Sequence, residues 1–385
     1  MEPMLTHSRP RVVVIGGGIA GVSAAYALAE HPSEPHVHLV ETEQALAHHT
    51  TGRSAAQLIV NYGTAPTKAL TVAGLDFFQS PPDDLVVAPL LTTRGVLSLA
   101  APAQVGLAET QAAEGRAAGA TIELLDATEA CRLAPLLRPE PIEVAVFEPE
   151  SADIDVAGLH QAFVRGVRAA GGTIEPARRV TALGPDGDGW RIDTTDGPLT
   201  TDLVVNAAGA WGDEVAAMAG VTPVGLEPRR RTAFMVAAPD GAPDEPLVAE
   251  ITHTWYAKRD GAQYLCSPAD ETPSAPCDAK PEEIDVAMAI DRINTATTLD
   301  ITSVRSAWAG LRTFSPDETM VLGPDPDRPS FVWCVGQGGT GIQTAPATGR
   351  LVADLAIDGA PRAGLVASGV DASAFAAARF RTVNS

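Results

Sequence analysis

The sequence predicts an α/β protein in which a parallel sheet is interrupted by segments of antiparallel sheet. Short, wholly apolar runs such as Val12–Ile15 and Phe331–Val335 are typical of strands buried on both faces of a parallel sheet, and each leads into a glycine-rich turn and a helical pattern. Residues 88–149 and 223–305 instead alternate in polarity like antiparallel strands, with Pro/Gly turns such as Pro239–Gly241 between them. We expect these two stretches to form a second, inserted domain.

The chain length agrees with such a division, because 385 residues exceed the size of most single domains. The predicted boundaries assign residues 1–87, 150–222 and 306–385 to the first domain, and residues 88–149 and 223–305 to the second. Residues Met1–Pro10 carry no signal-peptide pattern. Residues 12–29 lack charge but contain four glycines, so a strand, turn and helix explain them better than a membrane span.

The first glycine-rich turn has the spacing of a dinucleotide-binding βαβ unit. The sequence Gly16-Gly17-Gly18-Ile19-Ala20-Gly21 follows the first strand and opens a helix that runs to Leu28. A second strand, His36–Val40, ends at Glu41, which lies 20 residues after Gly21 as this fingerprint requires. The spacing therefore predicts a Rossmann-like nucleotide-binding domain.

Each fingerprint residue has a physical reason. Gly16 allows the tight turn, Gly18 lets the backbone approach a pyrophosphate at the helix N-terminus, and Gly21 permits close packing of helix on strand. Glu41 can accept hydrogen bonds from a ribose.

Two later segments favour FAD over NAD as the nucleotide. Residues 202–209 form another buried strand that runs into small residues, and Gly336–Gly341 make a second glycine-rich turn more than 300 residues after the first. A nicotinamide-binding domain has no need of a second turn. A flavin has a use for it, because a helix N-terminus stabilises negative charge on the reduced ring.

Composition excludes several other classes. The net charge of −21 argues against nucleic-acid binding and against docking on anionic lipid through basic residues. Four cysteines stand far apart without a CxxC pair, so we expect neither a disulfide framework nor a zinc site. Reduced thiols are typical of the cytoplasm, where we expect the protein to be located. The adjacent His48 and His49 lack the spacing of helical metal ligands, and no metal is predicted. The sequence contains no GxSxG motif, so nothing in it indicates a serine hydrolase of that type.

Several separated motifs in the same order resemble the D-amino-acid oxidase superfamily of FAD-dependent oxidoreductases over nearly the whole chain, and within it the bacterial D-arginine dehydrogenases most closely. The motifs are His49–Ala56, Ala152–Asp155, Val205–Trp211, Trp308–Arg312 and Gln337–Thr344. The resemblance implies a glutathione-reductase-like FAD-binding domain with an inserted antiparallel-sheet substrate domain. It also implies a non-covalent FAD, because the cysteine that tethers flavin in sarcosine oxidases has no counterpart in residues 308–314.

The resemblance assigns residues to the cofactor and to the substrate carboxylate. The implied cofactor residues come from both glycine-rich turns and from the flavin-covering segment: Gly16, Gly18, Ile19, Ala20, Gly21, Glu41, Ser54, Ala56, Gly209, Gly338, Gly339, Thr340, Gly341 and Ile342. The implied catalytic residues are Arg231, Arg312, Tyr62 and Tyr256. A guanidinium can clamp a carboxylate with two charge-assisted hydrogen bonds, and a phenol adds an orienting donor. For each arginine a surface ion pair is the alternative, and for each tyrosine ordinary packing.

The departures from the resemblance lie in the predicted side-chain pocket. Val96 stands where D-arginine dehydrogenases place an acid for the substrate's guanidinium, Gln57 replaces a histidine and Ile59 a threonine. Leu247 and Ala249 occupy two further pocket positions. Because the carboxylate clamp is kept and this acid is lost, D-arginine is not the predicted substrate.

The sequence thus predicts FAD-dependent oxidation of an amino acid, expected to be the D-enantiomer with a neutral or apolar side chain. The product would be a 2-imino acid, which water converts to a 2-oxo acid and ammonia. Electrons would pass to a quinone, another carrier or O₂. Three alternatives stay open: oxidation of a secondary amine, oxidation of a 2-hydroxy acid, and a non-catalytic flavin-binding module.

Overall fold

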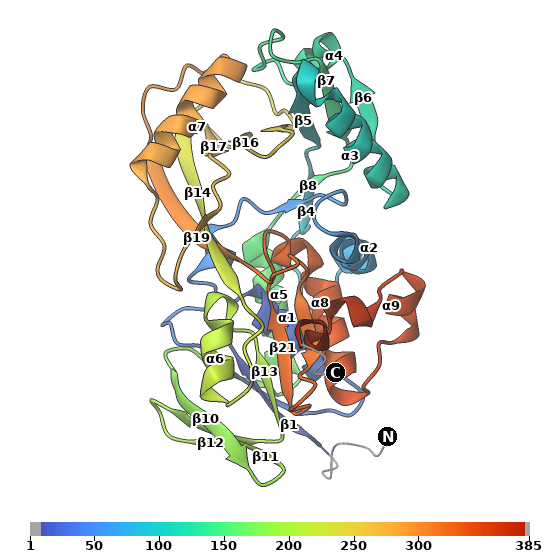
Figure 1. Ribbon diagram of the computed structural model, residues 1–385, viewed down its shortest axis with the longest axis vertical. Coiled ribbons are helices and arrows are strands. Elements are labelled where there is room, and N and C mark those ends of the chain that lie inside the picture. Colours follow the sequence, from blue (N-terminus) through green and yellow to red (C-terminus); the bar gives the residue numbers. More distant parts are fainter. Residues whose placement is uncertain (1–8, 382–385) are drawn as a thin grey trace.

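The computed structural model describes residues 9–381. Residues 1–8 and 382–385 lie outside the described residues. The prediction that Met1–Pro10 carry no signal-peptide pattern therefore falls mostly outside them. Figure 1 shows two sheet-based parts stacked along the long axis, joined by the strands β14 and β19.

A six-stranded sheet forms the lower part in Figure 1. The strands β9, β2, β1, β13 and β21 pair in parallel, and β20 adds an antiparallel edge. The strands predicted at 12–15, 36–40, 202–209 and 331–335 are all present in it. Their bounds are β1 Arg11–Ile15, β2 His36–Val40, β9 Thr173–Glu175, β13 Leu203–Asn206, β20 Val321–Pro324 and β21 Phe331–Val335.

This sheet is covered on both faces, which explains why its strands are apolar throughout. Val12 and Val14 of β1 face a helical layer, whereas Val13 and Ile15 face the opposite layer. The helical layer contains α1 Ile19–Ala29, α2 Ala65–Gln79, α5 Val156–Ala169 and α8 Gly341–Ile357. The helices predicted after the two glycine-rich turns are α1 and α8.

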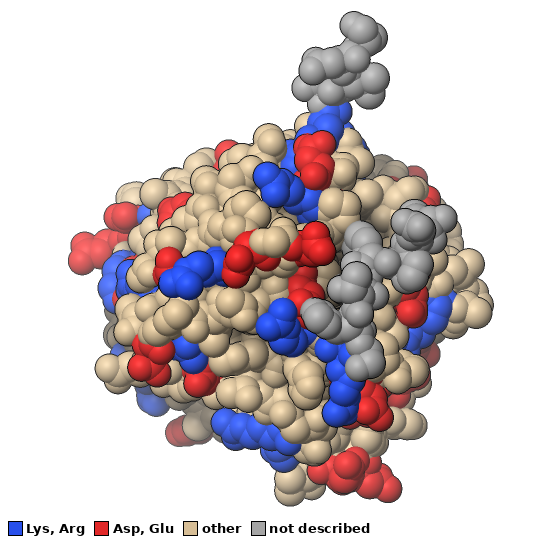
Figure 2. Space-filling model, turned by 90° about the horizontal axis from the view of Figure 1, so that it is seen from below, with Lys and Arg blue, Asp and Glu red and all other residues tan. Residues whose placement is uncertain are grey.

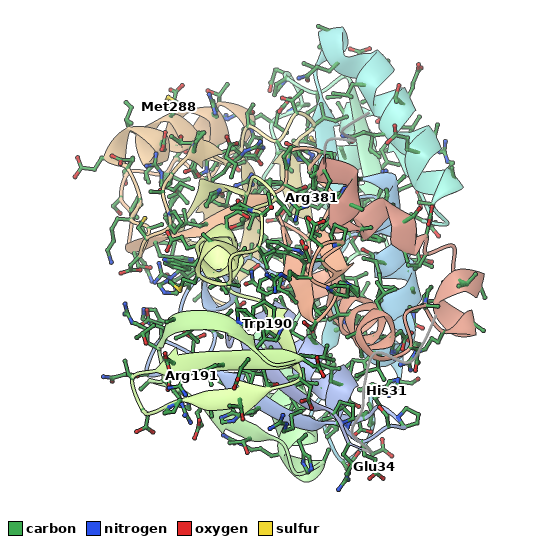
Figure 3. All side chains as sticks on the ribbon, turned by 60° about the horizontal axis from the view of Figure 1, so that its bottom comes forward. His31, Glu34, Trp190, Arg191, Met288 and Arg381 are labelled. Atoms are coloured by element: carbon green, nitrogen blue, oxygen red, sulfur yellow. The ribbon has the colours of Figure 1, made fainter. Side chains whose placement is uncertain are left out.

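The opposite layer is a three-stranded antiparallel sheet with one short helix. Trp190 lies between this small sheet and the main sheet (Figure 3). The indole is 1% exposed, donates a hydrogen bond to Ser330 Oγ (3.0 Å) and contacts the ring of Phe331. The elements are β10 Val180–Asp186, β11 Gly189–Thr194, β12 Leu199–Thr201 and α6 Gly212–Met218.

A nine-stranded sheet forms the upper part. It is antiparallel except where β15 pairs in parallel with β5. Its strands come mainly from the two segments predicted to alternate. They are β5 Val96–Ala100, β6 Glu123–Leu125, β7 Val144–Glu148, β14 Glu227–Ala237, β15 Leu247–Glu250, β16 Tyr256–Asp260, β17 Gln263–Ser267, β18 Thr272–Pro273 and β19 Ser306–Phe314.

The segments predicted to alternate like antiparallel strands also contain three α-helices, which the sequence analysis did not predict. They are α3 Val105–Ala117, α4 Ala127–Leu133 and α7 Glu283–Ala296. On α7 the buried residues Ala289, Ile293 and Ala296 recur at helical spacing and pack against the sheet. On α4, Asp126 and Glu129 form a capping box.

The division of the chain into two domains stays a prediction. The strand β19 begins at the predicted boundary of residue 306, yet it pairs with β14 along its whole length and belongs to the upper sheet. A small fourth sheet lies between the parts and consists of β3 Gln57–Leu58, β4 Leu91–Thr93 and β8 Ala152–Ile154. The remaining elements are η1 Thr50–Arg53, η2 Pro102–Gln104, η3 Gly209–Trp211, α9 Ala363–Ala367, η4 Ala372–Phe375 and η5 Ala377–Phe380.

The lower face of the molecule carries basic and acidic residues interspersed rather than in separate patches (Figure 2). Among residues 9–381, none of the helices combines the length and apolar character needed to cross a membrane.

Candidate active site

A cavity of about 420 Å³ lies where the strands of the six-stranded sheet end. Ile15, Val40 and Ala207 line it at the carboxyl ends of β1, β2 and β13, the edge where open α/β sheets bind ligands. Most of the predicted cofactor residues line this larger cavity: Gly16, Gly18, Ile19, Ala20, Glu41, Ser54, Gly209, Gly338, Gly339, Gly341 and Ile342.

The two glycines that shape the first turn tolerate no side chain. Gly16 has φ +114°, and a Cβ there would lie 2.4 Å from the carbonyl oxygen of Ala207. A Cβ on Gly21 would lie 1.9 Å from the carbonyl oxygen of Gly16. Gly21 does not line the cavity, so the structure gives it the predicted packing role between α1 and β1.

Glu41 lies at the predicted position, and its carboxylate also holds the turn itself. One oxygen accepts a hydrogen bond from Gly17 N (2.6 Å), and the other accepts one from Glu43 N (2.8 Å). At the helix start, Ile19 N donates to Thr51 Oγ1 (3.0 Å). The cofactor-facing loop is therefore fixed before any ligand binds.

The second glycine-rich turn meets the same cavity from the far end of the chain. Gly338 and Gly339 precede α8, whose N-cap residue Thr340 makes no side-chain capping bond. Thr340 does not line the cavity; it is buried, and its hydroxyl donates to Gln337 O (3.1 Å). Its part in cofactor binding stays a prediction.

The lining of the larger cavity fits a polar cofactor. His49 Nδ1, Thr313 Oγ1 and Gln337 Oε1 are buried without a hydrogen-bond partner, and all three residues line it. Two helix N-termini, those of α1 and α8, open onto it without side-chain caps. Unpaired polar atoms together with the N-termini of two helices suit the phosphates and polar ring edge of a flavin nucleotide.

A second cavity of about 130 Å³ adjoins the first. Val96, Leu247 and Ala249 form a buried apolar cluster on one wall, with Ile59 and Tyr256 packed against it. Gln57 and Ala56 also line it, and the Gln57 amide donates to Asp153. The residues predicted for the substrate side chain are thus brought together from β3, β5, β15 and the loops beside them. Seven residues line both cavities: Ser54, Ala55, Arg231, Tyr256, Arg312, Gly339 and Ile342.

The predicted carboxylate clamp lies at this junction. Arg312 on β19 donates from Nη1 to the Tyr62 hydroxyl (3.0 Å), and its guanidinium lies against Gly339 just before α8. Burial opposes the charge of Arg312, but Tyr62 and Tyr256 outweigh it, and the pKa of Arg312 is raised. Arg312 therefore stays a cation within the site.

Arg231 on β14 combines a place at the junction with an ion pair. Its Nη2 lies 2.6 Å from Glu271 Oε1, and its Nε donates to the Asp270 carbonyl oxygen (2.9 Å). Burial and the neighbouring Arg312 charge lower the pKa of Arg231. Since Glu271 already pairs with it, Arg231 is the less free of the two arginines to hold a ligand.

Sequence reasoning missed His253 in the smaller cavity. Its ring makes an edge contact with Tyr62, with centroids 5.6 Å apart. Burial and the charges of Arg231 and Arg312 lower the pKa of His253, which is therefore neutral at pH 7. A lone histidine in a loop gave no motif by which to find it.

Sequence reasoning also missed Glu148, and this corrects the view that the side-chain pocket has lost its acid. Glu148 on β7 pairs across the sheet with Val96, lines the smaller cavity and is 6% exposed. Because cross-strand neighbours share a face, an acid on β7 reaches the place beside Val96. The pairing of β5 with β7 was the missing information.

The flavin-covering segment is tied to the strand that carries Arg312. Thr50 Oγ1 donates to Leu311 O (2.7 Å), Arg53 Nη1 donates to Ala309 O (2.8 Å), and Trp308 Nε1 donates to Arg53 O (3.0 Å). These three bonds therefore hold the short helix η1 against β19.

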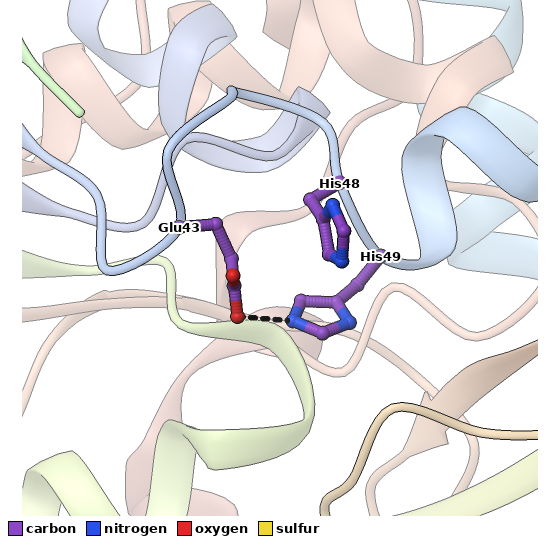
Figure 4. A group of neighbouring side chains, drawn as sticks. All are labelled: Glu43, His48 and His49. Atoms are coloured by element: carbon purple, nitrogen blue, oxygen red, sulfur yellow. Dashed lines mark hydrogen bonds and ion pairs between the residues drawn. The ribbon is translucent and has the colours of Figure 1, made fainter. Parts of the chain in front are cut away.

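Glu43 lies beside His48 and His49, the two histidines for which no metal was predicted (Figure 4). His49 Nε2 lies 3.1 Å from Glu43 Oε1, and the His49 ring contacts Trp211. All three grouped residues line the larger cavity. They belong to the wall of this cavity.

Comparison with known proteins decides the family. The family model described as "FAD dependent oxidoreductase" matches residues 11–355. The chain belongs to this family of FAD-dependent oxidoreductases. The cofactor of this family is FAD. Most of the residues predicted to bind it line the larger cavity.

Individual relatives agree with the family. The FAD-dependent oxidoreductase domain-containing protein 1 of Bos taurus is 26% identical over 408 residues, which cover 92% of this chain and 82% of the relative. Among solved structures, the L-proline dehydrogenase of P. horikoshii superposes with a TM-score of 0.84 at 20% identity, covering 97% of this chain and 98% of the other. The glycine oxidase of Geobacillus kaustophilus gives 0.81 at 22% identity, covering 96% and 99%. These matches support the superfamily and do not single out the D-arginine dehydrogenases.

Proposed function

We propose that this oxidoreductase oxidises an α-amino acid, in the D-configuration and with a neutral or apolar side chain, to the 2-imino acid. The observation that carries the proposal is the junction of the two cavities, where Arg312, which donates a hydrogen bond to Tyr62, lies against Gly339 just before α8. A pocket walled off from the cofactor would have favoured a non-catalytic flavin module. The smaller cavity instead shares seven lining residues with the larger one, so a molecule held in it would lie next to the larger cavity.

Arg312 would bind the substrate carboxylate, and Tyr62, already hydrogen-bonded to Arg312, would fix the angle of the guanidinium. Arg231 would add a second positive charge while it stays paired with Glu271. Tyr256, which packs on the apolar wall, would orient the substrate from the opposite side. Such positioning supplies a large part of the rate enhancement in reactions of this kind.

FAD, when bound, supplies the acceptor of the hydride from the α-carbon. The chain's own contribution is to hold the amino acid with its carboxylate anchored and its side chain against Val96, Leu247 and Ala249. We place no side-chain base in the reaction, because the amine need only arrive unprotonated. Water then hydrolyses the imino acid to a 2-oxo acid and ammonia.

Anaerobic flavin bleaching tests this function. D- and L-amino acids, N-methylglycine and 2-hydroxy acids are mixed with the oxidised holoenzyme, and the loss of flavin absorbance is followed. Reduction by neutral D-amino acids ahead of the other classes supports the proposal. Reduction by 2-hydroxy acids alone refutes it.

Secondary amines are the second candidate. The names of two similar proteins favour it, since the substrates of an L-proline dehydrogenase and a sarcosine dehydrogenase are secondary amines. Faster bleaching by N-methylglycine or proline than by any primary amino acid would establish this alternative.

We further propose that FAD is held without a covalent bond. The four cysteines are free thiols, none of them lies in residues 308–314, and none lines the larger cavity. Acid precipitation should release all of the flavin into the supernatant. Flavin that stays in the pellet would contradict the proposal.

A further inference from the structure

The smaller cavity has a buried acid on a wall that is otherwise apolar. Glu148 lines it beside Val96, its cross-strand neighbour, and Val96 in turn pairs with Leu247. Glu148 does not line the larger cavity, whereas Arg231 and Arg312 line both. The acid therefore lies away from the junction, on the side where a substrate's side chain would extend.

The carboxylate of Glu148 has few partners for a group buried so completely. Oε1 accepts a hydrogen bond from Val60 N (2.8 Å), and the backbone N–H of Asn61 and the Ser151 hydroxyl also favour the charged form. Within residues 9–381, no Lys, Arg or His forms an ion pair with it. A carboxylate offers about four acceptor positions, so capacity is left for another donor. A buried polar group with spare capacity costs free energy until a partner arrives.

The electrostatics of the cavity disfavour a cationic side chain. Arg231 and Arg312 both lie at the junction, and their charges contribute to lowering the pKa of His253 in the same cavity. A positively charged side chain on the substrate would meet the same repulsion from these two arginines. Burial also raises the pKa of Glu148, which weakens it as a counter-ion. A neutral donor avoids both costs and still satisfies the acceptor.

We propose that Glu148 is a specificity-determining residue that hydrogen-bonds a neutral donor, a hydroxyl or an amide, at the end of the substrate's side chain. The proposal rests on the function proposed above and narrows its substrate class. The methylene part of such a side chain would lie on Val96, Leu247 and Ala249, and its polar end would reach Glu148. Sites built around a substrate hydroxyl or amide reject analogues that lack it more strongly than apolar pockets reject small changes.

Matched substrate pairs test this assignment. D-norleucine is compared with D-6-hydroxynorleucine, and D-methionine with D-glutamine, by the rate of anaerobic flavin reduction. We expect wild-type kcat/KM to favour the donor-bearing member by about ten- to a hundredfold, the range for a hydrogen bond to a charged group. Glu148→Leu should remove or reverse the preference, while Glu148→Gln, which keeps an acceptor, should retain part of it.

Glu245→Gln is the matched control. Glu245 is a buried carboxylate next to the same sheet, 3% exposed and bonded to Tyr264, and it lines neither cavity. Its substitution should leave both substrate ratios unchanged. Equal loss of preference in Glu245→Gln and Glu148→Leu would overturn the assignment, because the effect would then be general.

Wild-type protein alone also decides the matter if the variants do not fold. A wild-type preference for norleucine over its hydroxy analogue overturns the proposal, as does a preference for D-lysine over both. If no amino acid reduces the flavin, the proposed function fails. If amino acids reduce it without a Glu148-dependent ratio, only the role of Glu148 fails.

Discussion

The two adjoining cavities are built by different means. The larger one is shaped by main chain, through Gly16, Gly21 and the turn before α8, where added side chains would collide with backbone or neighbouring atoms. The smaller one is shaped by side chains from strands far apart in the sequence, including Val96, Glu148 and Leu247. The difference indicates that the cofactor site depends on a few local spacings, whereas the substrate site depends on how strands pair.

We expect the largest effect from a substitution in the first glycine-rich turn, which shapes the larger cavity. In Gly21→Ala the new methyl would lie 1.9 Å from Gly16 O, so α1 must move away from β1. We expect the variant either to lack bound flavin or to lose about 1–3 kcal/mol or more in the free energy of unfolding. Absorbance at the flavin band and thermal denaturation measure both. Gly106→Ala on α3, where the methyl meets nothing within 4 Å, is the control and should be unaffected.

Next in size is the junction. Arg312→Ala removes a charge-assisted anchor worth about 1.5–3 kcal/mol, so kcat/KM should fall roughly ten- to more than a hundredfold. Flavin content should not change, because the guanidinium lies against Gly339 but donates its hydrogen bond to Tyr62 and not to either glycine-rich turn. Normal turnover by Arg312→Ala would show that the carboxylate is bound elsewhere.

The apolar wall makes a smaller distinction between substrates. We expect D-leucine or D-methionine to reduce the flavin faster than D-arginine by about tenfold or more, because a guanidinium would be buried near Arg231 and Arg312. Val96→Glu would place a second carboxylate beside Glu148 and should shift the ratio toward D-arginine. A wild-type ratio in favour of D-arginine would mean that Glu148 already acts as its counter-ion.

The smallest effect concerns pH and stability. Burial raises the pKa of Glu148, so the folded protein binds this proton more tightly than the unfolded chain does. Stability should therefore decline as pH rises from about 4.5, the ordinary value for Glu, through the raised pKa of the folded state. In Glu148→Gln this decline should be reduced, by about 1 kcal/mol or less at pH 7. Denaturant titrations of both proteins at pH 4.5 and 7.5 measure it, and identical pH slopes would contradict the shift.

The contrast between the cavities also explains what the sequence revealed. The βαβ unit, the second turn before α8, and the buried strands β13 and β21 follow from apolar runs and glycine spacing within short segments. Arg312 and Tyr62 were expected to act together, and the structure joins them by a hydrogen bond. These features depend on local sequence or on a resemblance that spans the chain.

What was missed depends on pairing between distant segments. Glu148 becomes a pocket residue only because β7 pairs with β5, and Arg231 gains Glu271 only through the fold of the loop after β17. The helix α7 was missed because its few buried residues, such as Ala289 and Ile293, leave a weak apolar stripe. Propensity and spacing contain none of this information.

The hydrogen bonds between η1 and β19 have a thermodynamic consequence. The segment that borders the nucleotide and the strand that carries Arg312 share three such bonds, among them those from Thr50 and Trp308. If filling one cavity orders this shared unit, a ligand in the other pays less to bind, and linkage makes the effect reciprocal. A carboxylate that binds the junction should then tighten the equilibrium binding of the flavin, and bound flavin should tighten the binding of that carboxylate by the same free energy.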